Sequence, residues 1–135
     1  MSFDIFLQCF RDKAPATFKR SDFEDIFGSY VVSRESNPGF VGVKFPDGSH
    51  ADVYISELEN IDGFMVNHCG GDAFFQALYQ LADRTKSSIY WPDSAPSSVV
   101  TDNATVSHLP NGFAEDFGTT VVNDGAGIIR AIQQT

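Results

Sequence analysis

The sequence predicts an α+β fold, with helices packed on one face of a mainly antiparallel sheet. Two alternating apolar runs around a Pro-Asp-Gly turn indicate a hairpin, and a long amphipathic segment after a further apolar run indicates the main helix. The elements follow in the order β-α-β-β-β-α-β, with a small α-β-α tail. With 135 residues and 42% hydrophobic side chains, the chain can bury one core, so residues 1–135 are expected to form a single domain.

The first strand and the first helix are predicted near the N-terminus. The segment 3–10, FDIFLQCF, is apolar on both alternating faces, which is typical of a central strand covered on two sides. After a polar loop, SDFEDIFG predicts a short helix, in which Ser21 and Glu24 have the spacing of a capping box and Gly28 marks the end. The residues YVV at 30–32 either extend this helix or begin a strand, and the pattern does not decide between them.

The stretch GFVGVKFPDGSHADVYIS predicts the hairpin. Its arms, 39–45 and 51–56, alternate in polarity, and Pro-Asp-Gly supplies residues that tight turns favour. A third apolar run, GFMVNH, follows an acidic loop and is expected to extend the sheet.

The second half of the chain begins with the longest predicted helix, DAFFQALYQLADRT, whose apolar residues recur at helical spacing and whose first residue, Asp72, is expected to cap it. SSIYW predicts a strand that Pro92 ends, and a Pro- and Ser-rich connection with a short Val-Val pair follows over 92–103. PNGFAEDF predicts a brief helix, TTVV a strand, and DGAGIIRAIQQ a terminal helix capped by Asp124.

The stretch NHCGGDAFF, residues 67–75, raises the question of a catalytic thiol. Cys69 precedes a helix start, where thiol pKa values fall, so a cysteine-dependent or small-ligand enzyme would use His68, Cys69 and Asp72. Neighbouring strand residues point to opposite faces, however, so His68 is badly placed as a base for Cys69. We therefore interpret Gly70 and Gly71 as the bend between strand and helix and keep the enzyme as the alternative.

Other chemical motifs are weak. The cysteines and histidines have no paired zinc spacing. VVNDGAGIIRAI resembles the start of a dinucleotide-binding turn, but Arg130 occupies its third position and no strand follows to complete a βαβ unit. The short basic cluster of Arg11, Lys13, Lys19 and Arg20 is interpreted as solvated surface. Because these motifs are weak, we expect no metal and no cofactor. We also expect no nucleic-acid partner, because phosphate contacts need a basic face.

The charge distribution points to a basic partner. Residues 21–72 hold ten acidic and two basic side chains, so most of the net charge of −9 lies there. Such a field repels anionic membranes and favours encounter with a basic protein. The N-terminus lacks a secretory signal, no apolar stretch reaches the roughly 20 residues of a membrane span, and two cysteines are too few for a disulfide framework. We expect a cytoplasmic protein that does not bind membranes.

Three parts of the chain resemble a group of small uncharacterised acidic bacterial proteins: MSFDIFLQCFRD with PATFKRSDFEDIFG, FPDGSHADVYI, and MVNHCGGDAFFQALYQLADRTKSSIYWP. The similarity covers about the first two-thirds of the chain. Such proteins are similar in character to the immunity proteins of bacterial toxin systems. The resemblance implies an inhibitor and carries over no functional residue.

The sequence thus favours a binding protein, of the immunity type, that neutralises a toxin by covering part of its surface. Acidic residues are the predicted contacts with a basic toxin domain, because opposite charges speed association and fix orientation. These residues lie on the short helix and in the loop before GFMV: Asp22, Glu24, Asp25, Glu57, Glu59 and Asp62. A structural or regulatory domain that self-associates is a further alternative, and the oligomeric state is not predicted.

Overall fold

The computed structural model describes residues 3–36 and 39–134. Its strands are β1 (Ile5–Arg11), β2 (Ala14–Pro15), β3 (Phe18–Lys19), β4 (Val31–Glu35), β5 (Phe40–Lys44), β6 (His50–Tyr54), β7 (Asn60–Ile61), β8 (Gly63–Gly70), β9 (Ser87–Tyr90), β10 (Ser98–Val100) and β11 (Thr119–Val121). Its helices are α1 (Arg20–Phe27), the 3₁₀ turn η1 (Gly28–Tyr30), α2 (Asp72–Thr85), α3 (Asn103–Val106), α4 (Phe113–Phe117) and α5 (Gly125–Gln133).

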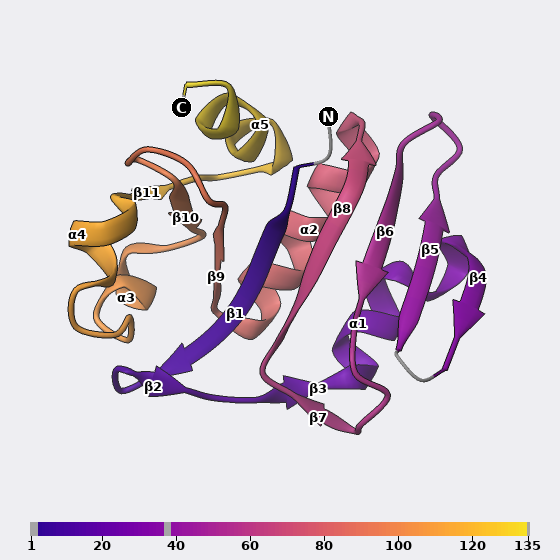
Figure 1. Cartoon of the computed structure of the whole chain (residues 1–135), viewed down its shortest axis with the longest axis horizontal. Coiled ribbons are helices and arrows are strands. Elements are labelled where there is room, and N and C mark those ends of the chain that lie inside the picture. Colours follow the sequence, from indigo (N-terminus) through magenta and orange to yellow (C-terminus); the bar gives the residue numbers. More distant parts are fainter. Residues whose placement is uncertain (1–2, 37–38, 135) are drawn as a thin grey trace.

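The architecture is the predicted α+β fold. One mixed, mostly antiparallel sheet has the order β11-β10-β9-β1-β8-β6-β5-β4, with β2 beside β1, and a separate two-stranded ribbon pairs β3 with β7 (Figure 1). Helices α1 and α2 lie behind this sheet, and α5 packs against α2 (Figure 1). None of the helices in the described part of the chain has the length and apolar character needed to cross a lipid bilayer.

The main core lies between the sheet and the helices α1 and α2. Strand β1 is central, as predicted, and its residues Ile5 and Leu7 are buried on the helix side of the sheet. The ring of Phe23 on α1 stacks on Phe27 and meets Phe64 of β8 edge-on, at centroid distances of 4.9 and 5.7 Å. Aromatic pairs of this geometry add stabilisation beyond their buried area, which accounts for the high phenylalanine content.

A row of apolar side chains crosses the opposite face of the sheet. Tyr54 faces Met65, Met65 faces Phe6, and Phe6 faces Tyr90 in the strand register. The Phe40 ring extends the row at 5.3 Å from Tyr54. At the other end, α4 covers Tyr90 and Phe10 with its residue Phe113 and forms a second, smaller core.

Helix α1 begins two residues before the predicted position. Its N-cap is Lys19, and no side chain caps the helix, so the predicted capping box of Ser21 and Glu24 does not form. The Glu24 carboxylate instead binds the guanidinium of Arg34 on β4. Gly28 follows the last helical residue, as predicted, but its backbone stays right-handed and leads into η1.

The undecided segment 30–32 divides between two elements. Tyr30 ends η1, and Val31 begins the edge strand β4. The pairing of β4 with β5 shifts register between Val31 and Ser33, which is a β-bulge. The strand ends with two exposed residues of opposite charge, Arg34 and Glu35.

The predicted hairpin is confirmed, and its turn also caps α2. In the hairpin, β5 pairs with β6. The N-cap position of α2 is Gly71, whose φ of 103° suits glycine and which has no side chain to offer. The N–H of Ala73 therefore donates to the Asp47 carboxylate at 3.1 Å and to the Ser49 hydroxyl at 3.2 Å. Asp72, the predicted cap, is instead the first residue of the helix and is exposed.

The C-terminal tail has the predicted α-β-α order of α4, β11 and α5. The Asp124 carboxylate caps α5, as predicted, by accepting from the N–H of Gly127 at 2.8 Å. The side-chain carbonyl of Gln76 accepts from the N–H of Gly125 at 2.9 Å and so ties α5 to α2. The Val-Val pair lies in β10, which runs parallel to β11.

Candidate partner-binding surface

The loop 56–62 joins β6 to β8, contains the short ribbon strand β7, and is anchored near both ends. Ile55, just before the loop, and Ile61, within β7, are buried in the core. The backbone N–H of Arg20 donates to the carbonyl of Glu59 at 2.8 Å, and the Arg20 guanidinium donates to the carbonyl of Ser56. Because backbone groups hold both halves, the side chains between them project from a fixed base.

The loop presents an exposed apolar side chain among acidic ones. Leu58 is 69% exposed and lies between Glu57 and Glu59 in the sequence. Among the ion pairs that the described residues form, none includes Glu57, Glu59 or Asp62. Glu57 accepts one hydrogen bond, from the Ser36 hydroxyl at 2.8 Å. The negative charge of this loop is therefore available to a partner.

A hollow of about 260 Å³ opens beside Leu58. Leu58 and Ile61 line its apolar part, and Asp62 stands at its polar part together with Thr17 and Ser56. A lysine or arginine side chain has matching chemistry, because its methylene groups lie well on apolar surface while its charged end stays near water. The hollow thus suits a basic side chain from another protein.

The predicted contact acids on α1 are neutralised within the chain. Arg84 of α2 lies 3.1 Å from Asp25 and 3.8 Å from Asp22. Arg34 binds Glu24 through two contacts of 2.5 and 3.1 Å. The hydrogen bond from Arg34 holds the pKa of Glu24 below its usual range, and the same bond raises the pKa of Arg34. The face of α1 is therefore a network of ion pairs rather than a bare acidic surface.

Arg20 connects the two groups of predicted contact residues. Its guanidinium lies 3.7 Å from the Glu24 carboxylate and also binds the Ser56 carbonyl. The acidic residues of α1 and those of the loop thus lie on either side of Arg20. Within the described part of the chain, the loop acids form no ion pair.

The candidate catalytic residues His68 and Cys69 make separate contacts. The His68 ring lies 3.0 Å from the carboxylate of Asp52, whereas the Cys69 side chain packs against the main core. Burial raises the pKa of the Cys69 thiol to about 11. In the described part of the chain, no hydrogen bond links Cys69 to His68 or Asp72, and no three His, Cys, Asp or Glu residues are grouped to hold a metal ion. The bend therefore places a half-buried thiol with a raised pKa before α2.

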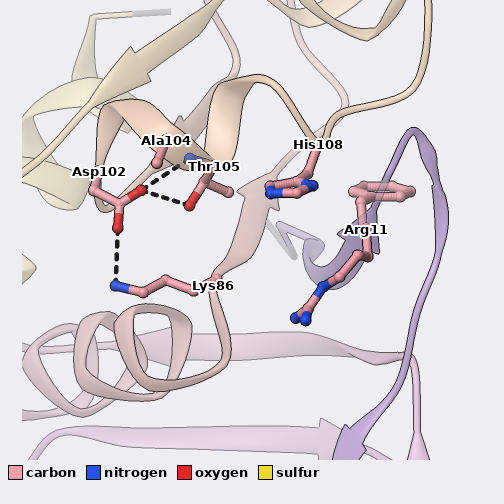
Figure 2. Close-up of a pocket in the computed structure, with 7 residues that line it drawn as sticks. Arg11, Lys86, Asp102, Ala104, Thr105 and His108 are labelled. Carbon is pink, nitrogen blue, oxygen red and sulfur yellow. Dashed lines mark hydrogen bonds and ion pairs between the residues drawn. The ribbon is translucent and has the colours of Figure 1, made fainter.

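A second concave site lies at the other end of the sheet, where β1, the end of α2 and α3 meet (Figure 2). This pocket has a volume of about 250 Å³ and is lined by Phe10, Arg11, Lys86, Asp102, Ala104, Thr105 and His108. The sequence placed Arg11 in a solvated basic cluster. No spacing pattern joins positions 11, 86 and 108, because only the tertiary fold brings them together.

One wall of this pocket is internally paired. Lys86 lies 2.8 Å from Asp102, and the backbone and hydroxyl of Thr105 also donate to the same carboxylate (Figure 2). These bonds, that from Lys86 foremost, lower the pKa of Asp102 to about 2, and the pairing raises the pKa of Lys86. Asp102 thus stays ionised and balances the charge of Lys86.

Comparison with known proteins yields no relative. No family model matches the chain, and no curated protein or solved structure matches it significantly. The likeness to small acidic bacterial proteins stays a prediction, so function must be argued from the surfaces themselves.

Proposed function

We propose that the chain is a cytoplasmic binding protein of the immunity type, which inhibits a basic toxin domain by covering part of its surface. The contact is made through the loop 56–62. Leu58 acts as the apolar anchor, and the acidic side chains around it attract and orient the partner.

The observation that carries this proposal is the exposure of Leu58 on an anchored loop. Leu58 lines a hollow together with Asp62, and binding energy at interfaces is concentrated in a few apolar anchors with a polar rim. The loop is already held by Ile55, Ile61 and Arg20, so little ordering entropy is lost on binding. The free charges of Glu57, Glu59 and Asp62 supply the rim.

The ion pairs of α1 support a contact centred on the loop. The three acids of α1 are engaged with Arg34 and Arg84, and breaking such pairs would reduce the gain from a new partner. A partner that binds Glu57, Glu59 or Asp62 breaks no ion pair of the described residues. We therefore assign the main contact to the loop and a secondary role to Asp22, Glu24 and Asp25.

A tagged pull-down from the native host tests the proposal. The captured protein is expressed alone, where it should arrest growth, and together with the wild-type chain, where growth should recover. Leu58→Asp should abolish both capture and recovery. Val32→Asp is the matched control, because Val32 is 67% exposed on the edge strand β4, two strands from β6 in the sheet, and should behave as the wild type. A captured protein that is harmless alone, or equal effects of the two substitutions, would contradict the proposal.

Self-association is separated by sedimentation of the chain alone. The proposal expects a monomer at high concentration. An oligomer that Leu58→Asp dissociates would show that the loop joins copies of this chain instead.

A further inference from the structure

We propose that the pocket between β1, α2 and α3 binds a small organic carboxylate with an apolar body. The site is independent of the loop 56–62 and lies across the molecule from it, at the α3 side (Figure 1). The pocket offers a guanidinium, a histidine donor, an apolar wall and a small volume.

Arg11 supplies the unpaired cation. Its guanidinium has no hydrogen-bond or ion-pair partner among the described residues, whereas Arg20, Arg34 and Arg84 all have one. Figure 2 shows this guanidinium beside the pocket, with the His108 ring on the same side and the Lys86–Asp102 pair opposite. A guanidinium with free donors matches the two oxygens of a carboxylate.

His108 supplies a donor whose direction is fixed by the backbone. The N–H of Asp12 donates to Nδ1 of His108 at 3.1 Å, so the proton of the neutral ring is on Nε2. The N–H of Lys13 also donates to the His108 carbonyl at 3.0 Å. Both turn residues have left-handed backbones, with φ values of 52° and 70°, as a two-residue hairpin turn requires. His108 thus clamps the turn, and the clamp sets the position of Arg11 at its base.

The apolar wall favours a ligand with a hydrocarbon part. The Phe10 ring lines the pocket with Ala104, and its edge contact with Phe113, at a centroid distance of 5.6 Å, holds it in place. The volume of about 250 Å³ is below the roughly 300–1,000 Å³ of pockets for drug-sized ligands. A single small ring or a short aliphatic chain fits this space.

The charge balance favours a monoanion. Asp102 offsets the charge of Lys86 across a 2.8 Å contact. The Asp12 carboxylate lies 3.6 Å from Nδ1 of His108, the ring nitrogen that faces the turn, so the guanidinium of Arg11 is the cation left for a ligand. A doubly charged phosphate would meet the Asp102 carboxylate without enough compensation. A carboxylate meets Arg11 and His108 and leaves the Lys86–Asp102 pair intact.

Backbone-amide NMR titration of the full chain tests the site. The probes are benzoate, the neutral isostere benzamide, inorganic phosphate, and a short peptide ending in phenylalanine with either a free or an amidated C-terminus. Arg11→Gln removes the proposed carboxylate contact. Lys44→Gln removes one positive charge from an exposed position on β5 and serves as the matched control.

Benzoate should shift the amides of Arg11, Lys86, Thr105 and His108, and its affinity should fall at least tenfold in Arg11→Gln but stay unchanged in Lys44→Gln. If the free-acid peptide binds more tightly than benzoate, the carboxylate is a chain terminus; the reverse order assigns a free metabolite. Equal binding of benzamide, tighter binding of phosphate, or an unchanged affinity in Arg11→Gln would overturn the proposal.

Discussion

The carboxylate of Asp47 accepts a hydrogen bond from the backbone N–H of Ala73 at 3.1 Å, across 26 residues of sequence. The turn of the hairpin therefore satisfies an amide at the N-terminus of α2, where Gly71 has no side chain to do so. The sheet and the longest helix are joined at this point by a cap that neither element contains alone.

Removing this cap should destabilise the protein more than removing the acid inside the helix. We expect Asp47→Ala to lower the midpoint of urea unfolding, because the Ala73 N–H loses one of its two acceptors and the Ser49 N–H loses the carboxylate that it also donates to. Asp72→Ala should have the smaller effect, since Asp72 makes no capping bond. Circular dichroism during urea titration measures both, and the opposite order of midpoints would show that Asp72 is the effective cap.

The two adjacent glycines should respond differently to alanine. Gly71 has a φ of 103°, and an added Cβ would collide with Ser49, whereas an added Cβ on Gly70 has open space. Gly71→Ala should therefore cost about 2 kcal/mol or more of unfolding free energy. Gly70→Ala should stay within about 0.5 kcal/mol of the wild type. Chemical denaturation provides the comparison, and similar losses in the two variants would contradict this account of the bend.

The Cys69 thiol should be unreactive. Burial raises its pKa to about 11, so little thiolate exists at neutral pH, and the thiolate is the form that attacks. Iodoacetamide should modify Cys69 more than tenfold more slowly than free cysteine at pH 7, with a rate that climbs as the pH approaches 11. Cys69→Ser leaves the buried Cys9 as a control for unfolding. Faster alkylation than free cysteine would restore the enzyme hypothesis.

The ion pair of Asp102 should make part of the stability depend on acid pH. The folded pKa of about 2 lies below the ordinary value of 3.8, so the stabilisation is fully present above the unfolded pKa. It is lost as the pH falls from 3.8 towards 2. The stability difference between the wild type and Asp102→Asn should be constant near neutral pH and shrink over this window. Urea midpoints at several pH values test it, and a difference that grows on acidification would exclude the pairing.

Local patterns predicted the elements better than their ends. The hairpin and the helix 72–85 follow from alternation and helical periodicity, which are properties of contiguous residues. The cap from Asp47 was not predictable, because it depends on how the turn meets α2 in space. The capping box at Ser21 and Glu24 does not form because the helix begins at Arg20, so both residues lie inside it. Arg34, from another element, binds the Glu24 carboxylate.

The candidate surfaces also contain some features that local sequence predicts and others that depend on the tertiary fold. The exposed loop acids could be predicted from composition, since a loop between strands is solvated. The neutralisation of Asp22 and Asp25 could not, because Arg84 lies about 60 residues further along the chain and reaches α1 only through helix packing. The pocket at Arg11 and His108 likewise has no local signature, since the turn residue Asp12 and the His108 ring that accepts its N–H are 96 positions apart.

The bulge in β4 has a consequence for how molecules of this chain meet at high concentration. A regular, flat edge strand would offer its unpaired backbone N–H and C=O groups to another molecule, and two sheets could then pair edge to edge. The register shift between Val31 and Ser33 and the charges that follow interrupt that template. Fibril growth from this edge is thereby opposed, and encounters are left to loops and side chains.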